Sequence, residues 1–119
     1  DLFYKNIHEL SGGQKQLLNL ASITAMNPEL MILDEPTAQL DPIARENFFN
    51  TLKKLNRDLS ITIIITEHTL EDILPISDRL LVLENEKIIY NDSPEKIYKI
   101  AAKAFTPTNF PATTESAIL

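Results

Sequence analysis

Two short apolar runs constrain the fold of this chain more than any other feature. Residues 30–33 read LMIL and are closed by two acids, and residues 61–66 read ITIIIT, in which most side chains are β-branched. The unbroken apolar run at residues 30–33 is typical of a strand buried on both faces of a sheet. The β-branched residues at 61–66 favour a second strand. Between them, apolar side chains recur at helical spacing from Phe48 to Leu59. The order of strand, helix and strand predicts an α/β fold with a mostly parallel sheet and flanking helices.

Capping and turn signals divide the rest of the chain into further elements. Ser11 begins a predicted helix that ends at Asn27-Pro28, and Asp41-Pro42 begins the helix between the two strands. The other predicted elements are a short helix from Thr69 to Pro75, a β-hairpin that turns at Asn85-Glu86 and a helix from Ser93 to about Lys103. Residues 105–119 are rich in Pro, Thr and Ala, so we expect a linker or a loosely ordered tail after a folded part over residues 1–104.

Charge and composition exclude several classes of function. A net charge of −6 and a pI near 4.8 provide no long-range attraction to nucleic acid, and no nucleic-acid partner is expected. The absence of cysteine excludes a disulfide framework and a thiolate metal site. Every apolar run lies far below the roughly 18 to 20 residues that cross a bilayer. The chain opens without methionine, and we interpret it as a fragment of a longer protein.

Both glycines of the chain stand side by side, at Gly12 and Gly13. Ser11 and Gln14 around them fit a capping box, and one interpretation is a capped helix start with no further role. The other interpretation is an anion site, because a helix N-terminus offers free N–H groups and the positive end of a dipole. Glycine would let a phosphate approach these N–H groups closely. Glycine also lowers helix propensity, and the sequence shows no structural benefit that offsets this cost.

Two acids, Asp34 and Glu35, follow the first apolar run directly. An acidic pair after a strand often marks only the point where the chain leaves the core. However, ligands of open α/β sheets bind at the carboxyl ends of the strands. Nucleotide hydrolysis there needs one carboxylate for Mg²⁺ and another to orient and deprotonate the attacking water. Asp34 and Glu35 are therefore candidates for these two roles.

Two further polar residues have both a structural and a functional interpretation. Asp41 is explained as the N-cap of the helix that begins at Pro42. His68 lies just after the ITIIIT run, where a histidine in a surface loop is the simpler interpretation.

Four motifs, taken together, resemble those of the ABC-type ATPase family. LSGGQKQ, LMILDEP, TAQLDP and IIITEH occur in the order and at the separations of the family's signature motif, Walker B motif, D-loop and H-loop. The match covers roughly residues 8–100. The resemblance implies part of a P-loop NTPase-type layered fold with a C-terminal β-hairpin, and it implies ATP and Mg²⁺ as cofactors.

The resemblance also implies roles for individual residues. Asp34 matches the Mg²⁺-linked aspartate, Glu35 the catalytic base and His68 the histidine that contacts the γ-phosphate. Asp41 matches the D-loop aspartate, which communicates across a dimer interface. In this family the signature motif binds the γ-phosphate of an ATP held mainly by the opposite subunit of a head-to-tail dimer, and the residues that match it are Ser11, Gly12, Gly13 and Gln14.

The chain departs from the family pattern at several places. It contains no G-x-x-x-x-G-K-[ST] stretch, so we expect this phosphate loop upstream and expect the fragment alone to be inactive. Asn85-Glu86 and Asn91-Asp92 stand where the family commonly has glycine. We expect turns with positive φ at both places, because Asn and Asp tolerate this conformation best after glycine.

Within the family, the segment TEHTLEDILPISDR resembles the ATPase subunit of energy-coupling-factor importers of vitamins or metal ions. This implies transmembrane transporter subunits and a second ABC ATPase domain as partners, at the cytoplasmic face of the cell membrane. Two alternatives stay open. One is a soluble ABC-type ATPase that acts on ribosomes or DNA, and the other is a non-catalytic interaction module with the same fold.

Overall fold

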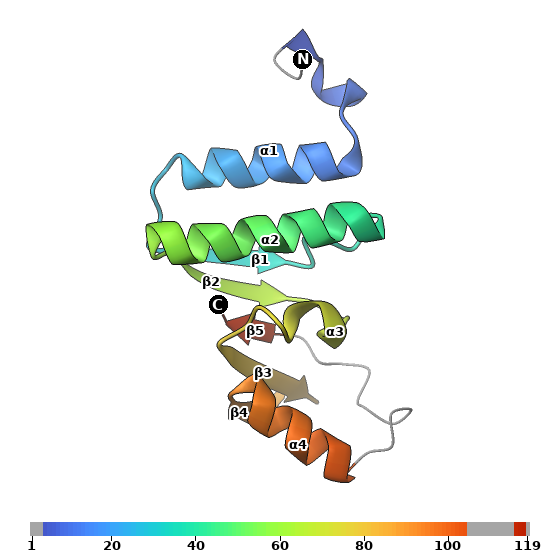
Figure 1. Cartoon of the computed structure of the whole chain (residues 1–119), viewed down its shortest axis with the longest axis vertical. Coiled ribbons are helices and arrows are strands. Elements are labelled where there is room, and N and C mark those ends of the chain that lie inside the picture. Colours follow the sequence, from blue (N-terminus) through green and yellow to red (C-terminus); the bar gives the residue numbers. More distant parts are fainter. Residues whose placement is uncertain (1–3, 105–115, 119) are drawn as a thin grey trace.

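The computed structural model describes residues 4–104 and 116–118 (Figure 1). The helices are the 3₁₀ turn η2 (Ile7–Glu9), α1 (Gly12–Thr24), α2 (Pro42–Leu59), α3 (Leu70–Ile73) and α4 (Pro94–Ala104). The strands are β1 (Leu30–Asp34), β2 (Thr62–Thr66), β3 (Arg79–Glu84), β4 (Lys87–Asp92) and β5 (Ser116–Ile118). The predicted α/β class is confirmed.

The five strands form one sheet in the order β1-β2-β5-β3-β4. β1 and β2 pair in parallel, whereas the neighbouring pairs β2–β5, β5–β3 and β3–β4 are antiparallel. Because β5 is antiparallel to both of its neighbours, β1, β2 and β3 point in the same direction. Their carboxyl ends therefore lie at one edge of the sheet, as the α/β interpretation requires.

Two helices pack together at one end of the molecule and a third at the other. Figure 1 shows α1 and α2 side by side above the sheet, and α4 beside the β3–β4 hairpin. α2 also contacts β2 and α3. The buried core follows this arrangement, with Phe48 and Leu52 of α2, Ile63 and Ile65 of β2 and Leu80 of β3 almost free of solvent.

Residues 116–118 do not belong to a loose tail. They form β5, which fills the space between β2 and β3 and pairs with both through its backbone. An extended segment fits there because each flanking strand presents backbone N–H and C=O groups that need partners. The expectation of a linker is therefore wrong for these three residues, and residues 105–115 and 119 lie outside the described residues.

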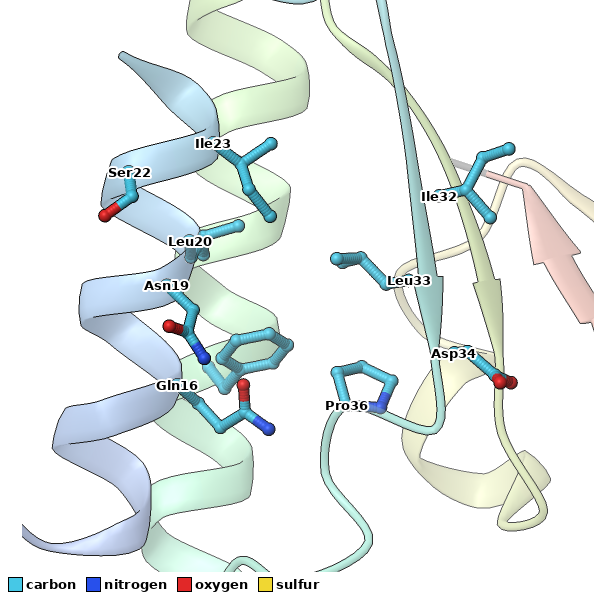
Figure 2. Close-up of a pocket in the computed structure, with 10 residues that line it drawn as sticks. Gln16, Asn19, Leu20, Ser22, Ile23, Ile32, Leu33, Asp34 and Pro36 are labelled. Atoms are coloured by element: carbon cyan, nitrogen blue, oxygen red, sulfur yellow. The ribbon is translucent and has the colours of Figure 1, made fainter. Parts of the chain in front are cut away.

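β1 is buried on one face only, in contrast to the prediction of a strand covered on both. Met31 is 2% exposed, whereas Leu30 and Ile32 are 50% and 66% exposed. Figure 2 shows the reason, since Leu33 points toward α1 and Ile32 points away from it. β1 is one of the two edge strands of the described sheet, and helices α1 and α2 pack on the Leu33 side.

One predicted turn is confirmed and the other is wrong. Asn85 and Glu86 have φ of 48° and 62°, the positive pair that a two-residue hairpin turn between β3 and β4 requires. Asn91 and Asp92 instead continue β4, where they pair with Leu81 and Leu80 of β3. Pairing with β3 keeps these residues extended, and the Asn91 side chain accepts a 2.6 Å hydrogen bond from Nε of Arg79.

No helix in the described ranges is both long enough and apolar enough to cross a membrane.

Candidate functional site

The acidic pair lies at the carboxyl end of the parallel strands. β1 ends at Asp34 and β2 ends at Thr66, and these two residues are paired in the parallel ladder. The Thr66 hydroxyl donates a 2.5 Å hydrogen bond to Oδ1 of Asp34. The backbone N–H of Glu35 donates to the same hydroxyl at 3.0 Å and to the Thr66 carbonyl at 3.1 Å. Thr66 thus fixes both acids relative to β2.

Glu35 and His68 meet in front of these strand ends. Oε1 of Glu35 lies 2.6 Å from Nε2 of His68, and their side chains are 44% and 56% exposed. Solvent or a ligand can therefore reach both groups. A carboxylate that a histidine orients in this way can accept a proton from water. The structure brings together three of the sequence-predicted residues here: Asp34, Glu35 and His68.

The backbone at Glu35 is strained. Its φ of 42° lies in the left-handed region, which costs a residue other than glycine about 1–3 kcal/mol and persists only where the surrounding structure holds it. This conformation turns the chain sharply after β1 into the loop of residues 35–41. The hydrogen bonds to Thr66 hold the start of this loop.

A second contact between the same two loops is buried. Glu67 is 6% exposed and Thr37 is 2% exposed. Oε1 of Glu67 accepts hydrogen bonds from the Thr37 hydroxyl at 2.6 Å and from the Thr37 backbone N–H at 3.2 Å. The sequence indicates a role for neither residue. An acid directly after a strand is rarely buried, so the sequence indicates neither the burial of Glu67 nor its partner.

The start of α1 has the predicted capping box. The Ser11 hydroxyl accepts from the Gln14 N–H at 3.2 Å, and Oε1 of Gln14 accepts from the Ser11 N–H at 3.0 Å. Asp41 likewise caps α2, because its carboxylate accepts a 2.9 Å hydrogen bond from the Ala44 N–H. These hydrogen bonds stay within the two helix starts, and none of them joins Asp34, Glu35 or His68.

The two glycines differ in their structural need. A Cβ added at Gly13 would lie 2.9 Å from Cβ of Ala44, so the approach of α1 to α2 requires glycine there. A Cβ at Gly12 would lie 3.7 Å from both Gln39 O and Leu40 Cδ2, an ordinary contact. The absence of a structural benefit, inferred from the sequence, is therefore wrong for Gly13 and stands for Gly12.

We expect Gly13→Ala to lower the free energy of unfolding by about 1–3 kcal/mol, the usual cost of an inserted methyl group in a packed contact. Chemical denaturation of the full-length chain would measure it. The matched control is Gly12→Ala, whose change should stay within about 0.5 kcal/mol because the position is open. Ala44→Gly should restore much of the loss in Gly13→Ala, and an unchanged unfolding midpoint in Gly13→Ala would contradict the packing argument.

A cavity of about 360 Å³ lies between α1 and the end of β1 (Figure 2). Its lining combines apolar side chains with the polar groups of Gln16 and Asn19. Asp34 lies at the edge of this lining, at the end of β1, but its carboxylate points away from α1 (Figure 2).

The exposure and hydrogen bonding of the Asp34 carboxylate are suitable for binding Mg²⁺. Mg²⁺ keeps several waters and takes one or two protein carboxylates, and Asp34 is an exposed carboxylate that Thr66 holds in place. In the part of the chain that the structure describes, no group of three or more acidic, histidine or cysteine side chains is arranged to hold a metal ion. A Mg²⁺ ion here would thus depend on phosphate oxygens and water for most of its ligands.

Known proteins match this chain in sequence and in fold. The family model described as "ABC transporter" matches residues 1–38. A candidate ABC transporter ATP-binding protein of Bacillus cereus is 48% identical over 97 residues, which are 82% of this chain and 18% of that protein. The energy-coupling factor transporter ATP-binding protein EcfA1 of Caldanaerobacter subterraneus is 45% identical over 92 residues, 77% of this chain and 33% of that protein.

A solved structure agrees with these relatives. A nucleotide-free ATP-binding cassette from an ABC transporter matches with a TM-score of 0.74 and 30% identity, over 87% of this chain and 40% of that chain. The chain spans 18% of the length of the first curated relatives that it matches. Sequence and fold together show that the chain matches one part of the cassette domain of ABC transporter ATP-binding proteins.

Proposed function

We propose that the full-length protein binds and hydrolyses ATP to power a membrane importer of the energy-coupling-factor type, for vitamins or metal ions. The observation that carries the ATPase proposal is the 2.6 Å contact between Glu35 and His68 beside Asp34. The importer proposal rests on the 45% identity to EcfA1.

Each group at the strand ends has a role in this proposal. Asp34 holds Mg²⁺ directly or through water, and the ion when bound neutralises charge on the phosphates. Glu35 accepts the proton of the attacking water, and His68 orients Glu35 and contacts the γ-phosphate. The exposure of both side chains supports these roles, because the water and the phosphate must reach them.

The signature residues serve a different nucleotide. Ser11, Gly12, Gly13 and Gln14 lie at a helix start whose hydrogen bonds are separate from the Glu35–His68 pair. This separation supports a head-to-tail dimer with a second ATPase domain, in which Ser11 and its neighbours meet the partner's γ-phosphate and Asp41 lies near the interface. The phosphate-binding loop, which these 119 residues lack, belongs to another part of the full-length protein. The membrane partners are transporter subunits at the cytoplasmic face.

The experiment that tests the ATPase proposal is phosphate release from ATP by the purified full-length protein, with and without Mg²⁺. We expect release with Mg²⁺ and its loss when the ion is chelated, because the phosphate charges are then no longer neutralised. Equal release in both conditions, or none with Mg²⁺ and membrane subunits present, would contradict the proposal.

Co-purification distinguishes the ATPase of a membrane importer from a soluble ABC-type ATPase that acts on ribosomes or DNA. Full-length protein isolated from gently solubilised membranes should carry integral membrane subunits with it. Recovery with ribosomes or DNA instead would favour the soluble ATPase.

A further inference from the structure

The hydrogen-bonded pair Thr37–Glu67 joins the two loops that carry the candidate catalytic groups. Thr37 follows Glu35 by two residues, and Glu67 directly precedes His68. Both hydrogen bonds between Thr37 and Glu67 end on one carboxylate oxygen, at 2.6 Å and 3.2 Å. The contact spans 30 residues of sequence. It therefore sets how the loop of residues 35–41 lies against the loop of residues 67–69.

This pair is buried, unlike the groups it lies beside. Glu67 is 6% exposed, whereas the side chains of Glu35 and His68 are about half exposed. A buried carboxylate is costly unless it accepts hydrogen bonds, so Glu67 holds its two donors firmly. Thr37 uses both of its donors for this contact, because its hydroxyl and its backbone N–H donate hydrogen bonds to the same carboxylate.

The turn at Glu35 lies between the Thr66 and Thr37 hydrogen bonds, and its backbone needs to be held on both sides. Glu35 has a left-handed backbone with φ of 42°. Thr66 holds the N-terminal side of this residue through the Glu35 N–H. On its C-terminal side, after Pro36, the next anchored residue is Thr37. Glu67 thus completes a two-sided restraint on the turn that directs Glu35 toward His68.

We propose that Glu67 is a positioning residue, which acts through Thr37 to hold the strained Glu35 turn in the geometry that places Glu35 against His68. This inference rests on the proposed ATPase function. It assigns Glu67 no contact with nucleotide, so the loss of its carboxylate should affect turnover far more than ATP binding.

The test compares Glu67→Ala with Glu67→Gln in the full-length protein. A misplaced catalytic group costs up to about a hundredfold in rate, so we expect Glu67→Ala to lower kcat by roughly ten- to a hundredfold. The KM for ATP should change by less than about twofold, because binding in the ground state is not involved. Glu67→Gln should recover most of kcat, since its amide oxygen can accept both hydrogen bonds from Thr37.

Glu71→Ala is the matched control, because Glu71 is an exposed acid on the neighbouring helix α3. Its kcat should equal that of the unmodified protein. If kcat of Glu67→Ala also equals that of the control, or if KM rises as much as kcat falls, the positioning role is wrong.

A second pair of variants covers the case in which Glu67→Ala does not fold. Thr37→Ser keeps the hydroxyl and should keep kcat, whereas the isosteric Thr37→Val removes it and should lower kcat with KM unchanged. An unchanged kcat in Thr37→Val would overturn the inference.

Failure of this inference is distinguishable from failure of the proposed function. If Glu35→Gln retains full turnover, the role of Glu35 is wrong and the proposed catalysis fails. If Glu35→Gln is inactive while Glu67→Ala and Thr37→Val are both fully active, only the positioning role fails.

Discussion

Glu35→Gln in the full-length protein is expected to lower the rate of ATP hydrolysis by about 10²- to 10⁴-fold, the usual contribution of a general base. The amide has nearly the same shape as the carboxylate but cannot accept the proton of the attacking water. The backbone N–H of Glu35, which binds Thr66, is unaffected by the change, so the strand ends should keep their structure. ATP binding and ATP-dependent dimerisation should therefore persist.

Phosphate release at saturating ATP, measured together with the fraction of dimer by size, would check this. Glu46→Gln is the matched control, because Glu46 is an exposed acid on α2. It should behave as the unmodified protein. Undiminished turnover in Glu35→Gln would remove Glu35 from the catalytic role.

The second large effect that we expect is a loss of ATP hydrolysis in Ser11→Asp. Aspartate is as good an N-cap as serine, so α1 should keep its start and the protein its stability. In the proposed head-to-tail dimer, however, its negative charge would face the γ-phosphate of the partner's ATP. Like charges brought together at an interface cost several kcal/mol, which corresponds to a loss of about a hundredfold or more in hydrolysis.

Ser11→Ala is the matched comparison for Ser11→Asp. It removes the cap without adding charge, so it should lower the free energy of unfolding by about 1 kcal/mol and reduce turnover less. ATP affinity of the isolated Ser11→Asp subunit should match the unmodified protein, because in the proposed dimer Ser11 serves the nucleotide of the opposite subunit. Equal loss of ATP binding by that subunit would contradict the head-to-tail arrangement.

Local signals in the sequence were sufficient to predict several elements. The helix starts at Ser11 and Asp41 depend on side chains that bond to N–H groups three residues away. The turn at Asn85-Glu86 depends on the φ preference of the residues themselves. The order of elements then follows from the period of the apolar side chains.

Other features depend on partners that the local sequence does not name. Asn91 and Asp92 have the composition of a turn, but pairing with β3 keeps them extended. Residues 116–118 have little strand character, but they lie between two strands whose backbones need partners. In both cases the tertiary environment overrides the local preference.

The candidate site was likewise predicted in part. Asp34, Glu35 and His68 are close together because β1 and β2 are parallel neighbours, which the pattern of apolar runs indicates. The buried contact between Thr37 and Glu67, and the close approach of Gly13 to Ala44, each join residues about 30 positions apart. Such contacts depend on how the loops and helices pack, and no local period or motif reveals them.

The one-sided burial of β1 also matters for handling the protein. An edge strand presents a row of unpaired backbone groups, and Leu30 and Ile32 add exposed apolar surface along it. Edges of this kind are templates on which a second chain can add a strand. When residues 1–119 are produced without the rest of the protein, we therefore expect them to self-associate through β1. A charged residue in place of Ile32 should keep them in solution.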